Sequence, residues 1–160
     1  MKKLLELLSE NARLTTTELS FLLNEPEEKI KAQIAEYEEK GIIKGYRTLI
    51  NWEKVPNAGV TALIELKVTP KKETGFDEIA QSVMSFDEVE SVYLIAGVYD
   101  LAVFVKGNTI QEVASFVSKK LSALDSVIST ATHFLLKRYK DGGVSFAETE
   151  REEDKRGLIL

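Results

Sequence analysis

The sequence has no cysteine and a single histidine, His133, among its 160 residues. Without cysteine the chain cannot form a disulfide, a thiolate zinc site or a cysteine nucleophile. One histidine leaves a zinc site or a histidine-based catalytic triad with almost no side chains to draw on. We therefore expect no metal, no other cofactor and no catalysis by the common routes.

Long apolar runs are also missing from the chain. No stretch reaches the roughly 18 uninterrupted apolar residues that would span a bilayer. The leucine-rich start is interrupted by Glu6 and Glu10, and no small-residue cleavage site follows, so it does not resemble a signal peptide. We expect a protein of the cytoplasm with no membrane partner.

The net charge of the chain is -5, with 44% hydrophobic and 29% charged residues. These fractions are ordinary for a soluble globular protein that can bury a core. The negative balance argues against indiscriminate nucleic-acid binding by the whole chain. A local basic patch remains compatible with it.

Apolar residues in the first part of the chain recur at helical spacing in three short segments. The first stripe is Leu4, Leu5, Leu7 and Leu8. Thr15 and Glu18 form a capping box, which predicts where the second helix starts. Pro26 suits the first position of the third helix, because its missing N–H has no partner there. The apolar sides of these two helices would carry Leu19, Leu22, Leu23, Ile30, Ile34 and Tyr37.

A glycine stop and a basic, extended segment follow the third helix. Gly41 lies where a left-handed residue usually ends a helix, and residues 42–50 read as a small β-ribbon around Lys44 and Gly45. Three helices and such a ribbon, or wing, are the pattern of a winged helix-turn-helix. We therefore expect a DNA-binding domain over residues 1–50, with double-stranded DNA as its partner.

The third helix is acidic for a helix that binds DNA. Its glutamates outnumber its lysines: Glu27, Glu28, Glu36, Glu38 and Glu39 stand against Lys29, Lys31 and Lys40. One interpretation is a solvated face on which Glu27 pairs with Lys31, and Glu36 with Lys40, at i,i+4 spacing. Gln33 could bond an adenine edge or could simply be exposed.

Residues 51–58, which include Pro56, break the periodicity and are expected to form a linker. Strand and helix periods follow in the order strand 60–68, helix 76–84, strands 89–96 and 99–106, helix 110–124 and strand 127–139. This βαββαβ order predicts a ferredoxin-like domain over residues 59–140. The fold class of the whole chain is therefore α+β.

Two helices would cover one face of that sheet and leave the other face open. The residues expected on the open face are unusually apolar: Thr61, Leu63, Val92, Leu94, Ala102, Phe104, Ala131 and Leu135. We infer a homodimer formed through the sheet or its edges.

Residues 141–160 have no apolar periodicity and are expected to form a polar C-terminal tail, either disordered or an arm. The apolar residues 158–160 at its end could dock on a partner, although fraying is usual for a terminus.

Read from its residues alone, the run Gly97-Val-Tyr-Asp100 is a tight hairpin, with Gly97 at positive φ and Asp100 bonding turn amides. An acid–base set of Asp100 with His133 or Arg138 is disfavoured, because no nucleophile motif or metal cluster accompanies it. We therefore expect that the protein is not an enzyme. His133 reads as a surface or interface residue.

Three short motifs, in this order and spacing, resemble the Lrp/AsnC (leucine-responsive/asparagine-regulator) family of transcription regulators over residues 2–140. Asn11-Ala-Arg-Leu-Thr15 is similar to the family's turn after its first helix. Gly41-Ile-Ile-Lys-Gly-Tyr46 is similar to its wing entry, and Gly97-Val-Tyr-Asp100 to the turn between its middle strands. The resemblance implies a homodimer built by the ferredoxin-like domains, which can assemble further into a tetramer or an octameric disc. It also implies small effectors such as amino acids, bound between dimers.

The resemblance implies that the effector-binding residues are Gly97, Val98, Tyr99 and Asp100, with Thr130 and Thr132 from the last strand as neighbours. Asp100 would pair with the ammonium group of an amino acid. Val98 departs from the acidic or polar residue that is frequent there in the family, which leaves the identity of the ligand open.

Gln33 stands where the family typically has an arginine. The side chains that remain to contact phosphates or base edges are Lys29, Lys31, Gln33, Lys44 and Arg47. With ~4 such cations per subunit, we expect modest affinity with a shallow salt dependence, aided by assembly. The implied function is a sequence-specific DNA-binding transcriptional regulator modulated by a small effector. The alternative is a sensor or scaffold of the same fold with weak or no DNA binding.

Overall fold

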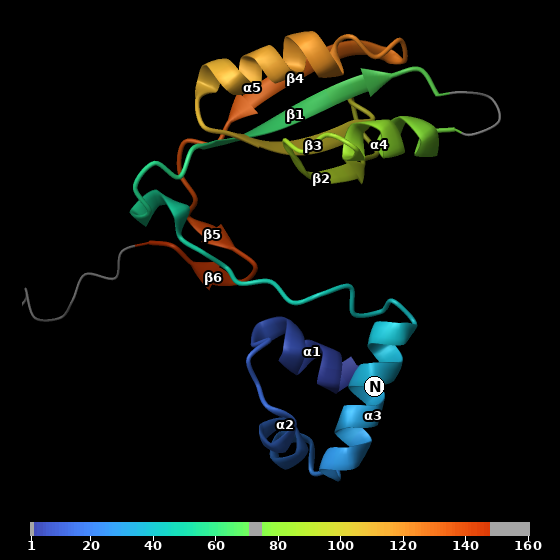
Figure 1. The fold of residues 1–160 in the computed structure, drawn as a ribbon, viewed down its shortest axis with the longest axis vertical. Coiled ribbons are helices and arrows are strands. Elements are labelled where there is room, and N and C mark those ends of the chain that lie inside the picture. Colours follow the sequence, from blue (N-terminus) through green and yellow to red (C-terminus); the bar gives the residue numbers. More distant parts are fainter. Residues whose placement is uncertain (1, 71–74, 148–160) are drawn as a thin grey trace, which may run out of the picture. The chain divides into compact units, whose positions relative to one another are not determined.

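The computed structural model describes residues 2–70 and 75–147, which divide into two compact units (Figure 1). One unit ends at Ile50 and the other begins at Asn51. Each has its own apolar core. None of the helices within these ranges has an apolar stretch long enough to cross a membrane.

The first unit consists of helices α1 (Lys2–Glu10), α2 (Thr16–Leu23) and α3 (Glu27–Glu39). Each helix turns one side inward, and the buried residues are Leu4, Leu8, Leu19, Ile30 and Tyr37. Burying a side chain of this size is worth roughly 2 kcal/mol. Five such residues make a small core, so polar bonds between the helices matter for the stability of this unit.

The predicted β-ribbon after α3 is wrong, because residues 42–50 contain no strand. The N–H groups of Ile42 and Ile43 both donate to the carbonyl of Tyr37, at 2.8 and 3.0 Å, and so close the end of α3. Beyond them the chain is extended but unpaired within the described residues. An isolated two-stranded ribbon is marginal in water. This segment instead contacts the helices, since Ile43 packs on the core of the first unit and the Tyr46 hydroxyl donates to Glu38 Oε1 at 2.9 Å.

The second unit has the predicted βαββαβ order. Its elements are β1 (Val60–Val68), α4 (Asp77–Met84), β2 (Val89–Leu94), β3 (Leu101–Gly107), α5 (Ile110–Phe116) and β4 (Val127–Phe134). The strands pair in the order β2-β3-β1-β4, and every pairing is antiparallel. The α+β class and the ferredoxin-like arrangement are therefore confirmed. The helix α5 continues as a π-helical turn, Val117–Leu121, before it ends.

Both helices pack on one face of the four-stranded sheet. On β1 every second residue is buried: Ala62, Ile64, Leu66 and Val68. Ile64 pairs with Val103, and Leu66 with Leu101, so the buried sides of β1 and β3 coincide. Ile79 of α4 and Val113 of α5 belong to the same core cluster.

The opposite face is open and partly apolar. It carries Leu63 of β1 and, directly opposite on β3, Phe104, while Ala131 of β4 lies opposite Glu65. Two residues were assigned to this face wrongly. Val92 pairs with Val103 and Leu94 with Leu101, so both lie on the side of the helices.

The misassignment has a local cause. The pairing of β2 with β3 shifts register between Val89 and Ser91, and a one-residue shift moves every following side chain to the other face. Tyr93 therefore occupies the open face, where its ring meets that of Phe104 edge-on at 6.2 Å.

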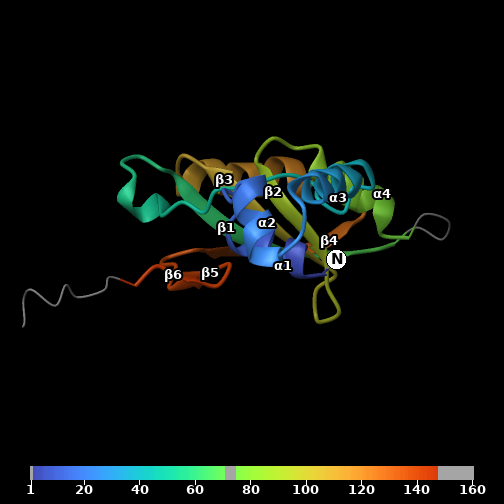
Figure 2. The same ribbon diagram turned by 90° about the horizontal axis from the view of Figure 1, so that it is seen from below.

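The last strand of the sheet ends at Phe134, earlier than predicted. Two short strands follow, β5 (Lys140–Asp141) and β6 (Val144–Ser145), which form a separate hairpin (Figure 2). Gly142 and Gly143 join them with φ of 50° and 83°, as a tight two-residue turn requires. Residues 141–145, expected in the polar tail, are thus structured. The residues 158–160 lie outside the described part of the chain.

Candidate nucleic-acid interface and effector site

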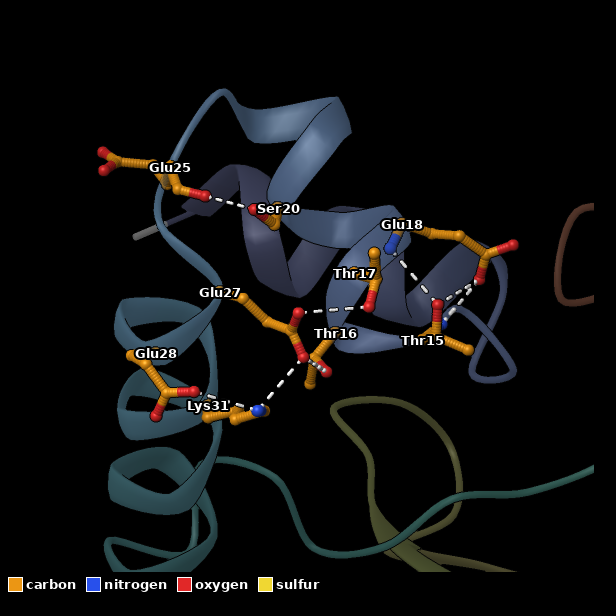
Figure 3. Close-up of polar contacts among 9 residues, drawn as sticks. All are labelled: Thr15, Thr16, Thr17, Glu18, Ser20, Glu25, Glu27, Glu28 and Lys31. Carbon is orange, nitrogen blue, oxygen red and sulfur yellow. Dashed lines mark hydrogen bonds and ion pairs between the residues drawn. The ribbon is translucent and has the colours of Figure 1, made fainter.

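The turn between α2 and α3 is closed by two local bonds. Asn24 adopts the left-handed conformation, with φ of 52°, and its N–H donates to the carbonyl of Phe21. Ser20 Oγ donates to the carbonyl of Glu25 at 2.5 Å (Figure 3). Asparagine tolerates the left-handed region better than most residues. These bonds fix the direction in which α3 leaves α2.

The predicted capping box at the start of α2 is confirmed. Glu18 N–H donates to Thr15 Oγ1 at 3.2 Å, and Thr15 N–H donates to Glu18 Oε2 at 2.7 Å. The hydrogen bonds from the Thr15 backbone and hydroxyl lower the pKa of the Glu18 carboxyl. The helix therefore starts at a well-defined residue.

Glu27, the first residue of α3, fastens that helix to the start of α2 (Figure 3). Its carboxylate accepts hydrogen bonds from Thr16 Oγ1 at 2.7 Å and Thr17 Oγ1 at 3.1 Å. Lys31 Nζ lies 3.1 Å from the same carboxylate. The Thr16 hydroxyl, and then Lys31 and Thr17, lower the pKa of Glu27. One of the acidic residues of α3 is thus structural, a role that no local sequence pattern signals.

The lysines of α3 are bound by carboxylates. Lys29 pairs with Glu25 at 2.8 Å. Lys31 pairs with Glu28 at 3.0 Å as well as with Glu27, and the hydrogen bond to Glu28 is the main cause of its raised pKa. Both predicted ion pairs are present: Lys40 Nζ lies 2.5 Å from Glu36 Oε1, and Lys31 Nζ lies 3.1 Å from Glu27 Oε1. Few positive charges on α3 are therefore left free for phosphates.

The other residues expected at DNA differ in environment. Gln33 is half-buried on the flank of α3. Lys44 and Arg47 are exposed, and neither forms an ion pair with a residue in the described ranges. Gly41 ends α3 at φ of 64°, as expected, and a Cβ there would lie 2.7 Å from Lys44 Nζ. The Lys44 side chain thus folds back over the end of α3, whereas Arg47 lies further along the extended segment.

The loop between β2 and β3 contains four of the residues expected to bind an effector. It projects beyond the end of the sheet (Figure 2), and Val98 in it is 81% exposed. Gly97 does not have a positive φ, so the expected glycine-dependent turn is wrong. The loop spans residues 95–100, and Ile95 N–H donates to the carbonyl of Asp100 at its base.

Asp100 is engaged by strand β1 instead of by turn amides. Its Oδ2 accepts a hydrogen bond from Val68 N–H at 2.9 Å, and Oδ1 lies 3.0 Å from Lys67 Nζ. The Val68 amide, and then Lys67, lower the pKa of Asp100. Its own N–H donates to Leu66 O at 2.9 Å. Asp100 therefore joins the loop to the end of β1.

The two threonines expected beside the loop lie across the sheet from it. Thr130 pairs with Leu66, which on its other side pairs with Leu101, so β1 separates Thr130 from the loop. Thr132 is two residues further along the same strand, opposite Ile64. Both threonines pair with buried residues of β1, so they lie on the face of the sheet that the helices cover. Within one chain they do not lie beside the loop.

Known proteins resemble both units of the chain. Residues 61–145 match the family model of the Lrp/AsnC ligand binding domain. The HTH-type transcriptional regulator YugG of Bacillus subtilis (strain 168) is 48% identical over 158 residues, which cover 98% of this chain and 94% of YugG. The chain belongs to the Lrp/AsnC family.

Other family members agree in extent and in fold. The proline dehydrogenase transcriptional activator of Rhodobacter capsulatus is 30% identical over 132 residues, covering 82% of this chain and 85% of that protein. The structure of the transcriptional regulator NMB0573 of Neisseria meningitidis, solved as a complex with L-Met, superposes with a TM-score of 0.70 at 26% identity. It covers 94% of this chain and 95% of the other.

Proposed function

We propose that the protein is a sequence-specific DNA-binding transcriptional regulator, modulated by a small effector bound to its second unit. The observation that carries the proposal is the helix pair α2 and α3, fastened through Glu27 with the outer side of α3 exposed. This arrangement occurs in a chain 48% identical to a relative described as an HTH-type regulator. A rigid helix pair with one free face is what docking in a major groove requires.

Contact with DNA is assigned to Lys29, Lys31, Gln33, Lys44 and Arg47. Lys44 and Arg47 are the main phosphate contacts in this proposal, because they are exposed and unpaired among the described residues. Lys29 and Lys31 are already neutralised by glutamates and contribute less. Each phosphate contact adds roughly 0.9 to the slope of log affinity against log salt, so a shallow slope follows.

The effector is proposed to bind at residues 97–100. In the assembled protein, Thr130 and Thr132 of one copy would lie next to this loop of another copy. The exposed loop and the L-Met complex of the Neisseria relative support an amino acid as the ligand. Its ammonium group would share the Asp100 carboxylate with Lys67 and the Val68 amide. Within a single chain β1 lies between the two threonines and the loop, so in this proposal a second copy completes the site.

Assembly is proposed to use the open face of the sheet, first as a homodimer and then as a tetramer or octamer. Leu63, Tyr93 and Phe104 give this face an apolar centre that the helices of the same chain leave uncovered. Apolar faces of this kind mark interfaces. Dimerisation would also place two α3 helices on one DNA molecule and compensate for weak contacts by avidity.

The test is a titration of the purified protein against the DNA upstream of its own gene at two salt concentrations. Binding at low salt that weakens moderately at high salt is the expected result. Absence of any binding at low salt would refute the regulator. The ion-paired lysines of α3 favour a second candidate function, a sensor or scaffold with little DNA affinity. A failure to bind DNA at low salt would support this second candidate.

A further inference from the structure

The outer side of α3 presents glutamates and alanines instead of basic residues. Ile30 and Tyr37 are buried and define the inner side of the helix. With 3.6 residues per turn, the side opposite to them carries Glu28, Ala32, Ala35 and Glu39, all exposed. Residues near the N-terminus of a recognition helix are those that reach base edges. On α3 that position belongs to Glu28, whose side chain is 87% exposed.

Glu28 is held in place by a chain of polar contacts that begins on α2 (Figure 3). Thr16 and Thr17 donate to Glu27, Lys31 bridges Glu27 and Glu28, and the Lys31 ammonium lies 3.0 Å from Glu28 Oε1. Two carboxylates share one ammonium, so this cluster carries a net negative charge. A negative cluster is repelled by phosphates and can approach DNA only where bases offer hydrogen-bond donors.

The major groove offers few such donors. Cytosine presents its N4 amino group and adenine its N6 amino group, but adenine places the N7 acceptor beside it. A carboxylate is therefore matched by cytosine and opposed by the O6, N7 and O4 acceptors of the other bases. The guanine paired with that cytosine presents O6 and N7, which a lysine ammonium can contact. A carboxylate and an ammonium 3.0 Å apart thus match the two halves of one C·G pair.

We infer that Glu28 and Lys31 together select a C·G base pair. The Glu28 carboxylate accepts a hydrogen bond from cytosine N4, and the Lys31 ammonium donates to guanine O6 or N7. Ala32, one turn along the helix, leaves room for the base edges to approach. The inference rests on the proposed DNA-binding function and names what α3 recognises, and it gives the acidity of this helix a direct role.

The test is selection of binding sites from random double-stranded DNA with the full chain and three variants. The wild type is expected to prefer C·G at one fixed position of each half-site by about tenfold. Glu28→Ala should lose that preference while its total affinity stays equal or rises, since a negative charge is removed. Glu28→Gln should move the preference towards A·T, because an amide matches adenine N6 and N7.

Glu39→Ala is the matched control, because it removes the same charge from the same side of α3 near its other end. It should keep the C·G preference. The readout is the base preference, which a general effect on helix stability would leave unchanged. The inference fails if Glu28→Ala selects the same sites as the wild type, or if Glu39→Ala loses the preference equally. A wild type that binds no DNA at low salt refutes the proposed function itself.

Discussion

Glu27 Oε1 lies 2.7 Å from Thr16 Oγ1, so the first residue of α3 is bonded to the first residue of α2. The carboxylate has a second hydroxyl donor, Thr17, and a cation, Lys31. An acidic residue at the start of this helix is therefore a fastening between the two helices of the DNA-binding unit. It also suits the partial positive charge at a helix N-terminus.

The fastening should depend on pH. The pKa of Glu27 is held below its usual 4.5, first by Thr16 and then by Lys31 and Thr17. A carboxyl with a lowered folded pKa contributes stability above its unfolded pKa, and that stability is lost as pH falls through the folded value. Thr16→Val should therefore increase hydrogen exchange in α2 and α3 at pH 7. The difference from the wild type should shrink as pH falls well below 4.5.

Glu39→Ala serves as the control for this measurement, since it removes an exposed carboxylate from the same helix. Its exchange should follow that of the wild type over the whole pH range. A difference between Thr16→Val and the wild type that persists unchanged at low pH would show that the Thr16 hydroxyl acts without the Glu27 charge.

The capping box makes a separate contribution to α2. Replacing Thr15 by alanine removes the side-chain acceptor of the Glu18 N–H, and such a loss costs about 1 kcal/mol. Denaturant unfolding, with exchange in residues 16–23 as the local probe, measures it. Thr48→Ala, in the exposed extended segment, is the matched control and should be neutral. Equal losses in both variants would contradict the assignment.

Patterns that repeat within a few residues were enough to predict much of the fold. The Thr15 capping box, the Gly41 stop and the βαββαβ order all follow from such spacing, and the structure has them. The register shift after Val89 could not be predicted, because it depends on the pairing of β2 with β3. The predicted ribbon was wrong because residue propensity describes only the local chain. Residues 42–50 favour an extended conformation, but no strand pairs with them in the described structure.

The candidate sites depend even more on contacts between distant residues. Glu27 meets Thr16 across eleven positions, and Asp100 meets Val68 across thirty-two, so no local period indicates either bond. Residue type alone suggested that the lysines of α3 face DNA. Their partners, Glu25, Glu27 and Glu28, show how far those charges are already neutralised.

The exposed segment after α3 should provide the sequence-independent part of DNA affinity. The double variant Lys44→Ala/Arg47→Ala is expected to weaken binding to specific and random DNA alike. Its slope of log affinity against log salt should be shallower than that of the wild type by about 2, or roughly 0.9 per phosphate contact. Lys119→Ala, an exposed cation of the second unit, should change neither quantity. An unchanged slope in the double variant would remove both residues from the interface.

The open face of the sheet should hold the proposed dimer together. Leu63→Glu places a charge at its centre, opposite Phe104, and burying an unpaired carboxylate costs several kcal/mol. Light scattering should therefore give the mass of a smaller species than for the wild type. Met84→Glu adds the same charge to an exposed position of α4 and should keep the wild-type mass. If Leu63→Glu assembles normally, another surface forms the dimer.

The Asp100 carboxylate already has two partners, Lys67 and the Val68 N–H, and an effector would have to share it with them. Its role in binding an effector can therefore be tested separately from its role in anchoring the loop. Lys67→Met removes the cation 3.0 Å from Oδ1 but keeps the Val68 N–H bond that anchors the loop. If an amino acid's ammonium binds Asp100, the variant should bind it several-fold more tightly in calorimetry, because Lys67 no longer competes. Asp100→Ala should abolish the heat. Lys119→Met controls for the lost charge. If Lys67→Met leaves the affinity unchanged, Asp100 only anchors the loop, and the ligand contacts other groups.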